Sequence, residues 1–379
     1  MSPAKVLIVL GTRPEVVKLA PVYRELRSRG HVFDVRLAST GQHREMLDQA
    51  LHIFGIRPDY DLDVMTRNQN LYGLTAAILT GMQGVLEDFE PDIVLVQGDT
   101  TTTMAGALAA YYKQIAVGHV EAGLRTGNKN SPFPEEVNRL LTGHIADFHF
   151  APTEMARGNL NRENIDDSRI YVTGNTSIDA IKWVISHTEP DFDSSLSPGL
   201  ADIVASGRFV LITSHRRESF GEPMRNTFRA IARLAKQYQD HGFVFPVHLN
   251  PNVREKAREI LGGIDNIHLL EPLDYVNFSH LMARSLLILS DSGGIQEEAP
   301  SLDKPVLVLR DTTERREGVE AGTAILTGTD PDRIHDEVRR LIEDAEHYSS
   351  MTRIENPYGD GKASARIADA LEKCVHPPT

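Results

Sequence analysis

Short apolar runs alternate with longer amphipathic segments along the whole chain, and this alternation limits the fold more than any other feature. The runs occupy residues 5–10, 92–97, 115–120, 209–213, 243–247, 286–290 and 305–309. They are rich in Val, Ile and Leu without strict alternation, which is typical of parallel strands buried on both faces. Helical patterns lie between them, near residues 15–29, 43–54, 71–88, 101–112, 135–146, 222–241, 275–285 and 330–346. Alternating strands and helices predict an α/β fold with right-handed crossovers.

A polar stretch rich in Pro, Gly and Ser, residues 186–208, interrupts this pattern. Such composition is typical of a linker, and a new apolar run begins directly after it. The chain of 379 residues is long enough to bury two cores. We therefore expect two doubly wound domains, one over residues 1–185 and one over residues 205–360.

Composition excludes several classes of protein. Asp and Glu number 53 against 40 Lys and Arg, so the net charge is -13, which argues against binding to nucleic acid. The single cysteine, Cys374, excludes a disulfide within the chain. No apolar stretch approaches the roughly 18 residues of a membrane-spanning helix, and no residue spacing resembles a metal site. We expect a cytoplasmic protein without metal, cofactor or membrane contact.

Ionisable side chains and glycines follow the predicted strands. Ligands of open parallel sheets bind beyond the carboxyl ends of the strands, so these positions are the candidate site. They are Gly11-Thr12-Arg13-Pro14-Glu15, Gly98-Asp99-Thr100-Thr101-Thr102-Thr103, His119 with Glu121, His215-Arg216-Arg217-Glu218, and Asp291-Ser292-Gly293-Gly294.

Two of these strand ends suit an anion. Ser292-Gly293-Gly294 opens a helix, so free backbone N–H groups and the positive end of the helix dipole would face a phosphate. The alternative is a tight turn with Ser292 as N-cap. Arg13 and Lys18 form a second candidate anion site, and its alternative is a capped helix with a proline near its first position.

Carboxylates and a basic cluster at other strand ends suit acid–base chemistry. Glu121 ends a buried strand, and Glu135 lies near the start of a helix. Carboxylates gathered in one crevice raise each other's pKa, which suits proton transfer near neutral pH. Asp99 would join them, or would cap the next helix. The run from His215 could neutralise a phosphate leaving group, or form a surface turn paired with Glu218.

Together these motifs resemble the bacterial non-hydrolysing UDP-N-acetylglucosamine 2-epimerases over about residues 5–370. The matching segments are Gly11–Glu15, Gly98–Thr102, Gly118–Thr126, Pro134–Glu136, His215–Glu218, His248–Pro251, Asp291–Pro300, Arg310–Arg315 and Asn356–Gly361. The resemblance implies a glycosyltransferase-B-like fold of two Rossmann-like domains with the active site between them. It also implies that a C-terminal helix, residues 362–375, packs back on the N-terminal domain.

The resemblance further implies a reaction, ligands and roles. The reaction is reversible inversion at C2 between UDP-N-acetylglucosamine and UDP-N-acetylmannosamine, through elimination and re-addition of UDP and the intermediate 2-acetamidoglucal. The product would supply N-acetylmannosamine units for surface polysaccharide. A second UDP-N-acetylglucosamine would act as allosteric activator, and the protein would be a homodimer. The implied catalytic residues are Asp99, Glu121, Glu135 and His215; the UDP-binding residues are Arg13, Lys18, His215, Phe278, Ser292, Gly293, Gly294, Glu298 and Arg315; the activator-binding residues are Gln42, Gln69, Glu135, Arg216 and His248.

Three other functions remain open on the sequence. A hydrolysing epimerase would release free N-acetylmannosamine and UDP. A glycosyltransferase of the same fold would need an acceptor sugar. A nucleotide-sugar sensor would bind without catalysis, although binding alone does not call for three carboxylates beside an anionic ligand.

Overall fold

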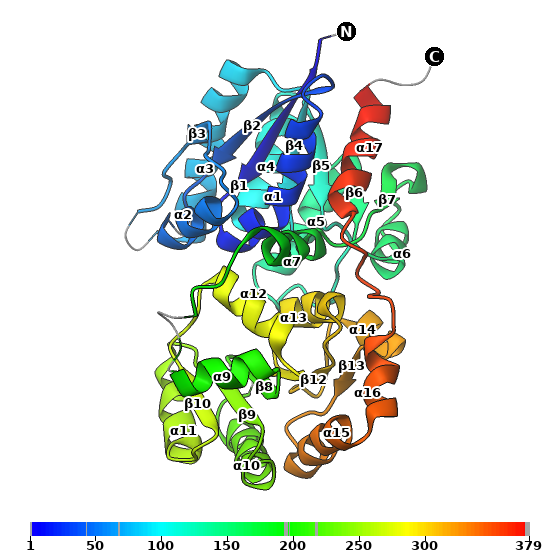
Figure 1. Cartoon of the computed structure of the whole chain (residues 1–379). Coiled ribbons are helices and arrows are strands. Elements are labelled where there is room, and N and C mark those ends of the chain that lie inside the picture. The colour runs from blue at the N-terminus through cyan, green and yellow to red at the C-terminus, as the bar shows by residue number, and fades with distance from the viewer. Residues whose placement is uncertain are drawn as a thin grey trace. The chain divides into compact units, whose positions relative to one another are not determined.

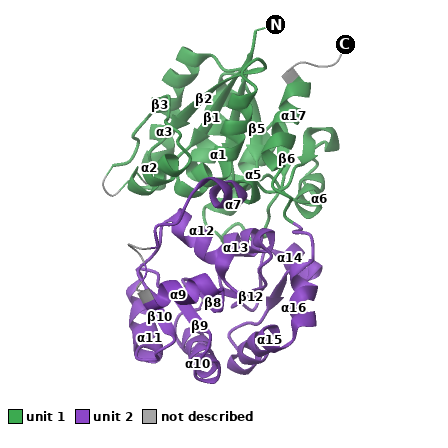
Figure 2. Cartoon of the chain, viewed as in Figure 1, with its two compact units in different colours: residues 1–180, 358–379 green, residues 181–357 purple. Residues whose placement is uncertain are grey.

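The computed structural model describes residues 2–42, 44–66, 69–192, 196, 198–216 and 219–375. The chain divides into two compact units (Figure 2): residues 1–180 with 358–379 form unit 1, and residues 181–357 form unit 2. The division falls inside helix α7 (Thr176–His187), ahead of the expected linker. Residues 198–206 of that linker form helix α9, because Leu200 and Val204 give it an apolar face that is buried in unit 2. Residues 193–195 and 197 of the linker lie outside the described ranges.

Unit 1 is built from one parallel sheet and its covering helices (Figure 1). Its strands are β1 (Ala4–Leu10), β2 (Phe33–Ser39), β3 (Tyr60–Asp61), β4 (Ile93–Gln97), β5 (Ala116–Val120), β6 (Phe148–Ala151) and β7 (Ile170–Val172). Its helices are α1 (Arg13–Ser28), α2 (Arg44–Ile53), α3 (Leu71–Phe89), α4 (Thr101–Tyr112), α5 (Glu135–Ile145), α6 (Glu154–Arg162), the 3-10 helix η1 (Asp167–Arg169), the start of α7, and α17 (Ala363–Val375).

Unit 2 repeats the plan with a second parallel sheet. Its strands are β8 (Phe209–Thr213), β9 (Gly242–Pro246), β10 (Ile267–Leu270), β11 (Leu287–Ser290), β12 (Val306–Val308) and β13 (Ala324–Leu326). Its helices are the end of α7, α9 (Pro198–Ser206), α10 (Glu222–Gln237), α11 (Pro251–Leu261), α12 (Tyr275–Arg284), α13 (Gly293–Glu298), the 3-10 helix η3 (Ala299–Leu302), α14 (Arg316–Ala321), α15 (Pro331–Glu343) and α16 (Ala345–Thr352).

The two units share one strand order, except that the sheet of unit 1 has one more strand, β7, at its edge. Within the described residues it runs β3-β2-β1-β4-β5-β6-β7 in unit 1 and β10-β9-β8-β11-β12-β13 in unit 2, with all pairs parallel. In each sheet the order of connection reverses between two central strands, β1 and β4 in one and β8 and β11 in the other. Such switch points are where doubly wound sheets bind ligands, beyond the carboxyl ends of the strands.

Burial on both faces of the sheet explains why the apolar runs lack alternation. In β8, Phe209 and Leu211 belong to one core cluster, whereas Val210 and Ile212 belong to the cluster on the opposite face. The prediction of doubly covered parallel strands is therefore confirmed. The sequence pattern did not predict strands β2, β3, β6, β7, β10 and β13, because they are short or carry polar residues, such as Asp34 and Arg36 in β2.

The C-terminal segment returns to unit 1 and docks there. Asp179 in α7 accepts hydrogen bonds from the backbone N of Ala363 at 3.1 Å and of Ser364 at 2.8 Å, at the start of α17. Arg29, directly after α1, pairs with Asp369 on α17 at 2.6 Å. None of the helices in the described ranges combines the length and apolar character needed to cross a membrane.

Candidate active site

The loops after β1 and β4 meet closely at the switch point of unit 1. A Cβ atom on Gly11 would lie 2.1 Å from Thr40 Oγ1 and 2.4 Å from Thr102 Oγ1. No side chain fits in that space, so only glycine lets β1 turn into α1 here. This close approach places the start of α1, with Arg13 and Lys18, beside the loop that carries Asp99.

Glu15 links these two loops, although we did not predict a role for it. Its Oε2 accepts hydrogen bonds from the backbone N of Gly11 at 3.0 Å and of Thr12 at 2.7 Å, and its Oε1 accepts one from Thr100 Oγ1 at 2.7 Å. Burial raises the pKa of Glu15, and these hydrogen bonds oppose the rise. The available signal was the spacing of Thr12 and Glu15, which is that of a capping box.

Glu121 turns the chain directly after β5 and receives two donors. Its φ of +63° lies in the left-handed region, which is uncommon for a residue with a side chain. Lys18 Nζ donates to its Oε1, and Gln97 Nε2 donates to its Oε2. The carboxylate is buried, with 8% of the residue exposed. Such strain tends to occur at functional sites, where surrounding contacts hold it in place.

Asp99 lies at the adjacent strand end and is held from α5. Arg139 pairs with its carboxylate, and Asn138 Nδ2 donates to its backbone oxygen at 2.9 Å. The N-cap alternative for Asp99 is wrong, because the Thr100 side chain caps α4 by accepting from the Thr103 N–H. The sequence analysis did not predict Arg139 as a site residue. Its spacing of four residues from Glu135, which places both near one side of α5, could have indicated it.

Glu135 begins α5, three and four residues before Asn138 and Arg139. Its Oε2 is buried and has no hydrogen-bond partner among the described residues. The next residue, Glu136, instead holds the preceding loop by accepting from the backbone N of Thr126 at 3.0 Å and of Gly127 at 2.9 Å. Contacts of β4, β5 and α5 thus gather the three predicted catalytic carboxylates at one edge of the sheet.

A buried histidine lies beneath these loops. His119 in β5 contacts the carbonyl oxygen of Gly98 through Nε2 at 2.8 Å and so supports the turn before Asp99. Its register partner in β6 is His149. Desolvation lowers the pKa of His119 to about 4 and that of His149 to about 3. Both rings are therefore neutral at pH 7.

The switch point of unit 2 brings His215 and Asp291 together. Asp291 is fully buried, and its Oδ2 accepts from the backbone N of His215 at 2.7 Å and of Arg216 at 2.9 Å. His215 Nδ1 lies 3.0 Å from Oδ1 of the same carboxylate. The rings of His215 and His248 stack with centroids 5.6 Å apart. Desolvation, followed by the charge of His215, lowers the pKa of His248.

A basic cluster covers the start of α13. A Cβ atom on Gly293 would lie 3.2 Å from the guanidinium carbon of Arg315, so this glycine permits a close approach. Arg315 Nε donates to Glu297 at 2.8 Å, and its Nη1 donates to Glu314 at 3.0 Å. Arg216 Nη2 lies 3.8 Å from Glu314. The alternative of a surface turn paired with Glu218 falls on residues 217 and 218, which lie outside the described ranges.

The structure places the remaining predicted residues as follows. Gln42 accepts a hydrogen bond from Thr102 at 3.3 Å, and Gln69 accepts one from the Thr66 backbone at 3.3 Å. Arg13 is exposed at the start of α1. Ser292 occupies the N-cap position of α13 without a capping hydrogen bond from its side chain, and Glu298 ends that helix. Phe278 packs against the core of unit 2.

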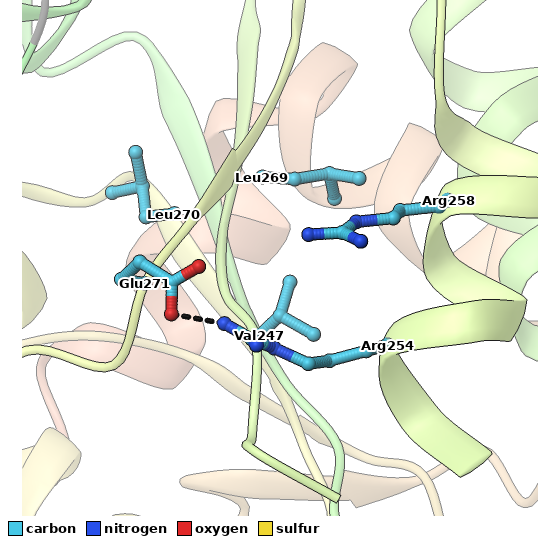
Figure 3. Close-up of a pocket in the computed structure, with 6 residues that line it drawn as sticks. All are labelled: Val247, Arg254, Arg258, Leu269, Leu270 and Glu271. Carbon is cyan, nitrogen blue, oxygen red and sulfur yellow. Dashed lines mark hydrogen bonds and ion pairs between the residues drawn. The ribbon is translucent and has the colours of Figure 1, made fainter. Parts of the chain in front are cut away.

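One small pocket lies at the edge of the second sheet (Figure 3), and none of the predicted site residues lines it. Its lining consists of Val247, Arg254, Arg258, Leu269, Leu270 and Glu271. Arg254 pairs with Glu271 across it. Over the described residues, no group of His, Cys, Asp and Glu side chains is arranged to hold a metal ion.

Comparison with known proteins agrees with this geometry. The family model described as UDP-N-acetylglucosamine 2-epimerase matches residues 24–372. The UDP-N-acetylglucosamine 2-epimerase of Escherichia coli K12 is 54% identical over 370 residues, which cover 97% of this chain and 98% of that protein.

Solved structures show the same fold. The UDP-GlcNAc 2-epimerase of Neisseria meningitidis, bound to UDP-GlcNAc, is 49% identical with a TM-score of 0.85, covering 97% of this chain and 100% of that one. The enzyme of Methanocaldococcus jannaschii, in complex with UDP-GlcNAc and UDP, is 34% identical with a TM-score of 0.75, covering 97% and 99%. The predicted class, two Rossmann-like domains with parallel sheets as in the glycosyltransferase-B-like fold, is confirmed.

Proposed function

The chain belongs to the UDP-N-acetylglucosamine 2-epimerase family of isomerases, and we propose that it inverts C2 of the UDP-sugar without hydrolysing it. The observation that carries this proposal is the gathering of Asp99, Glu121 and Glu135 at one edge of the sheet in unit 1. Proton removal and proton delivery on opposite faces of C2 need at least two acid–base groups.

The route that fits these groups is elimination followed by re-addition. The C2 hydrogen is not acidic in the sugar, because no carbonyl lies on an adjacent ring carbon. As the C1–O bond to the diphosphate breaks, C1 gains positive charge and the C2 proton becomes easier to remove. A carboxylate takes that proton, the C1–C2 double bond of 2-acetamidoglucal forms, and UDP departs with the electron pair. Re-addition delivers a proton to the other face of C2 while UDP bonds again to C1.

The acidic and the basic residues are assigned to different parts of the substrate. We assign the sugar ring to Asp99, Glu121 and Glu135 of unit 1. The leaving diphosphate needs cationic partners and hydrogen-bond donors, and in unit 2 we assign this role to His215 and Arg315. Arg13 and Lys18 of unit 1 stay UDP-binding predictions from the resemblance. The backbone N–H groups of Gly293 and Gly294 are further donors at the start of α13. Glu298 and Phe278 are assigned to the ribose and the uracil.

The test measures whether the hydrogen at C2 exchanges with solvent during turnover. In D2O with UDP-N-acetylglucosamine, we expect NMR to show deuterium at C2 and the appearance of UDP-N-acetylmannosamine. Free N-acetylmannosamine as the main product would indicate the hydrolysing alternative. Turnover without deuterium at C2 would contradict the elimination route.

We also propose that a second molecule of UDP-N-acetylglucosamine activates the enzyme. We further propose that the protein is a homodimer and that its product supplies N-acetylmannosamine units for surface polysaccharide. The activator would contact Gln42, Gln69, Glu135, Arg216 and His248. The stacking of His248 on His215 supports this, because it joins an activator residue to a UDP-binding residue. A rate curve without sigmoidal shape would contradict activation, and a monomer in sedimentation would contradict the dimer.

A further inference from the structure

We propose that Asp291 is a positioning residue that holds the His215 ring with Nδ1 inward and Nε2 directed away from the carboxylate, as a charged donor for the diphosphate. This inference deepens the proposed function, because it rests on His215 contacting UDP. The sequence places Asp291 at one of the candidate strand ends, but no role was assigned to it there.

The first support is the way in which Asp291 is held. Its carboxylate follows β11 and is fully buried at the switch point of unit 2. Oδ2 accepts the backbone N–H groups of His215 and Arg216 and lies 3.3 Å from Ser214 Oγ. These contacts fix the loop after β8 and the orientation of the carboxylate together.

The second support is the other oxygen, Oδ1. It is buried and meets no donor that satisfies hydrogen-bond geometry among the described residues. The nearest candidate is His215 Nδ1, at 3.0 Å. Because a buried carboxylate oxygen is costly without a donor, this contact favours a proton on Nδ1. The ring then directs Nε2 away from Asp291.

Charged and titratable groups lie around His215 on three sides. They are Asp291 after β11, His248 after β9, and the adjacent Arg216, which is itself near Glu314. Burial raises the pKa of Asp291, but the contacts with His215 and the backbone N–H groups outweigh burial and keep that pKa low. Asp291 is thus a lasting negative charge beside His215.

The first experiment observes the ring in the complete wild-type chain. Histidine is labelled with 15N, and His215 is assigned by comparison with His215→Gln and His248→Gln. Above its titration midpoint, we expect neutral His215 to carry its proton on Nδ1. A proton on Nε2 instead would overturn the inference, and this measurement depends on neither catalysis nor a variant of Asp291.

The second experiment uses Asp291→Asn, with Ser214→Ala as a matched control that removes another contact of the same carboxylate. We expect the midpoint of His215 to fall by about one unit or more in Asp291→Asn, because an opposite charge at this distance is lost, and to stay near wild type in Ser214→Ala. An unchanged midpoint in Asp291→Asn would overturn the inference.

The pH dependence of UDP binding distinguishes a positioning role of Asp291 from a purely structural one. The Kd of UDP, measured by calorimetry from pH 5.5 to 8.5, should weaken as wild-type His215 loses its proton. In Asp291→Asn that weakening should begin at lower pH, with about fivefold weaker binding near the wild-type midpoint for a one-unit shift. A uniform loss at every pH would reduce Asp291 to a structural role. Intact UDP binding and His215 titration in a protein without epimerase activity would instead refute only the proposed reaction.

Discussion

At the residue scale, the chemistry assigned to Glu121 depends on two neighbours that are distant in sequence. Lys18, which lies 103 residues before it, and Gln97 each donate to one carboxylate oxygen. The pairing holds the side chain in one place, and the cation stabilises its charged form. A reactive carboxylate held in this way can meet C2 of the sugar in a defined orientation.

Replacing Glu121 by Gln should therefore remove a proton acceptor while keeping the shape of the side chain. We expect turnover to fall by roughly 10²–10⁴-fold, the range for a lost acid–base group, and deuterium exchange at C2 to fall with it. The control is Glu154→Gln, whose side chain is 74% exposed on α6. A folded Glu121→Gln protein with near-normal turnover would contradict the assignment.

Gly11 is constrained by space. Gly11→Ala should destabilise the protein by about 1–3 kcal/mol, the usual cost of overpacking, because the added Cβ would overlap Thr40 and Thr102. Gly84→Ala is the matched control: this exposed glycine inside α3 has open space around it, and alanine should stabilise the helix by about 1 kcal/mol. Urea denaturation measures both, and equal effects of the two changes would contradict the packing argument.

At the element scale, the strand pair β5 and β6 carries two histidines into the interior. His119 and His149 are register partners, and desolvation keeps both uncharged in the folded state. A histidine whose folded pKa is lowered binds fewer protons when folded than when unfolded. The contribution of such a histidine to the free energy of unfolding is complete above its unfolded pKa of about 6.5. It is lost as the pH falls toward the pKa of the histidine in the folded protein.

The free energy of unfolding should accordingly decrease between pH 7 and pH 4. We expect the free energy of unfolding of the His149→Gln protein to decrease less over this interval, because one buried titrating group is removed. The control is His31→Gln, at an exposed position, which should retain the wild-type pH dependence. Urea denaturation at a series of pH values measures the slope, and an unchanged slope in His149→Gln would exclude His149 as a source of acid sensitivity.

The elements themselves were predictable where their pattern was strong. The apolar runs at β1, β4, β5, β8 and β11 and the helical patterns at α3, α4 and α5 agree with the structure to within a residue or two. Strands β6 and β10 were missed because they are short, and each includes a histidine. Helix α9 was missed because its Pro and Gly resemble a linker, and only packing against the core of unit 2 reveals its apolar face.

At the scale of the whole molecule, the chain leaves unit 1, forms unit 2 and returns. The return is secured at the start of α17, where buried Asp179 accepts two backbone N–H groups and the hydroxyl of Ser364. Ile367 and Leu371 of α17 are fully buried. Unit 1 therefore includes residues from both ends of the chain.

Asp179→Ala should destabilise unit 1 more than Arg29→Ala does. The first change leaves the N–H groups at the start of α17 without a buried acceptor, which costs about 1–3 kcal/mol. The second removes ion pairs with Asp369 and Glu372 that are partly exposed, and such pairs contribute about 0–1 kcal/mol. Thermal denaturation compares the two, and an equal or larger effect of Arg29→Ala would contradict this account of the docking.

The sequence by itself determined the α/β class, two doubly wound units, and the charged residues that follow the central strands. Those properties are local, because apolar runs and strand-end residues can be read along the chain. Only the tertiary structure decided the partners: Lys18 with Glu121, Arg139 with Asp99, Glu15 with Thr100, and His215 with Asp291. These pairs are set by the order of the strands, which brings together loops that are far apart in sequence, and no local pattern records that order.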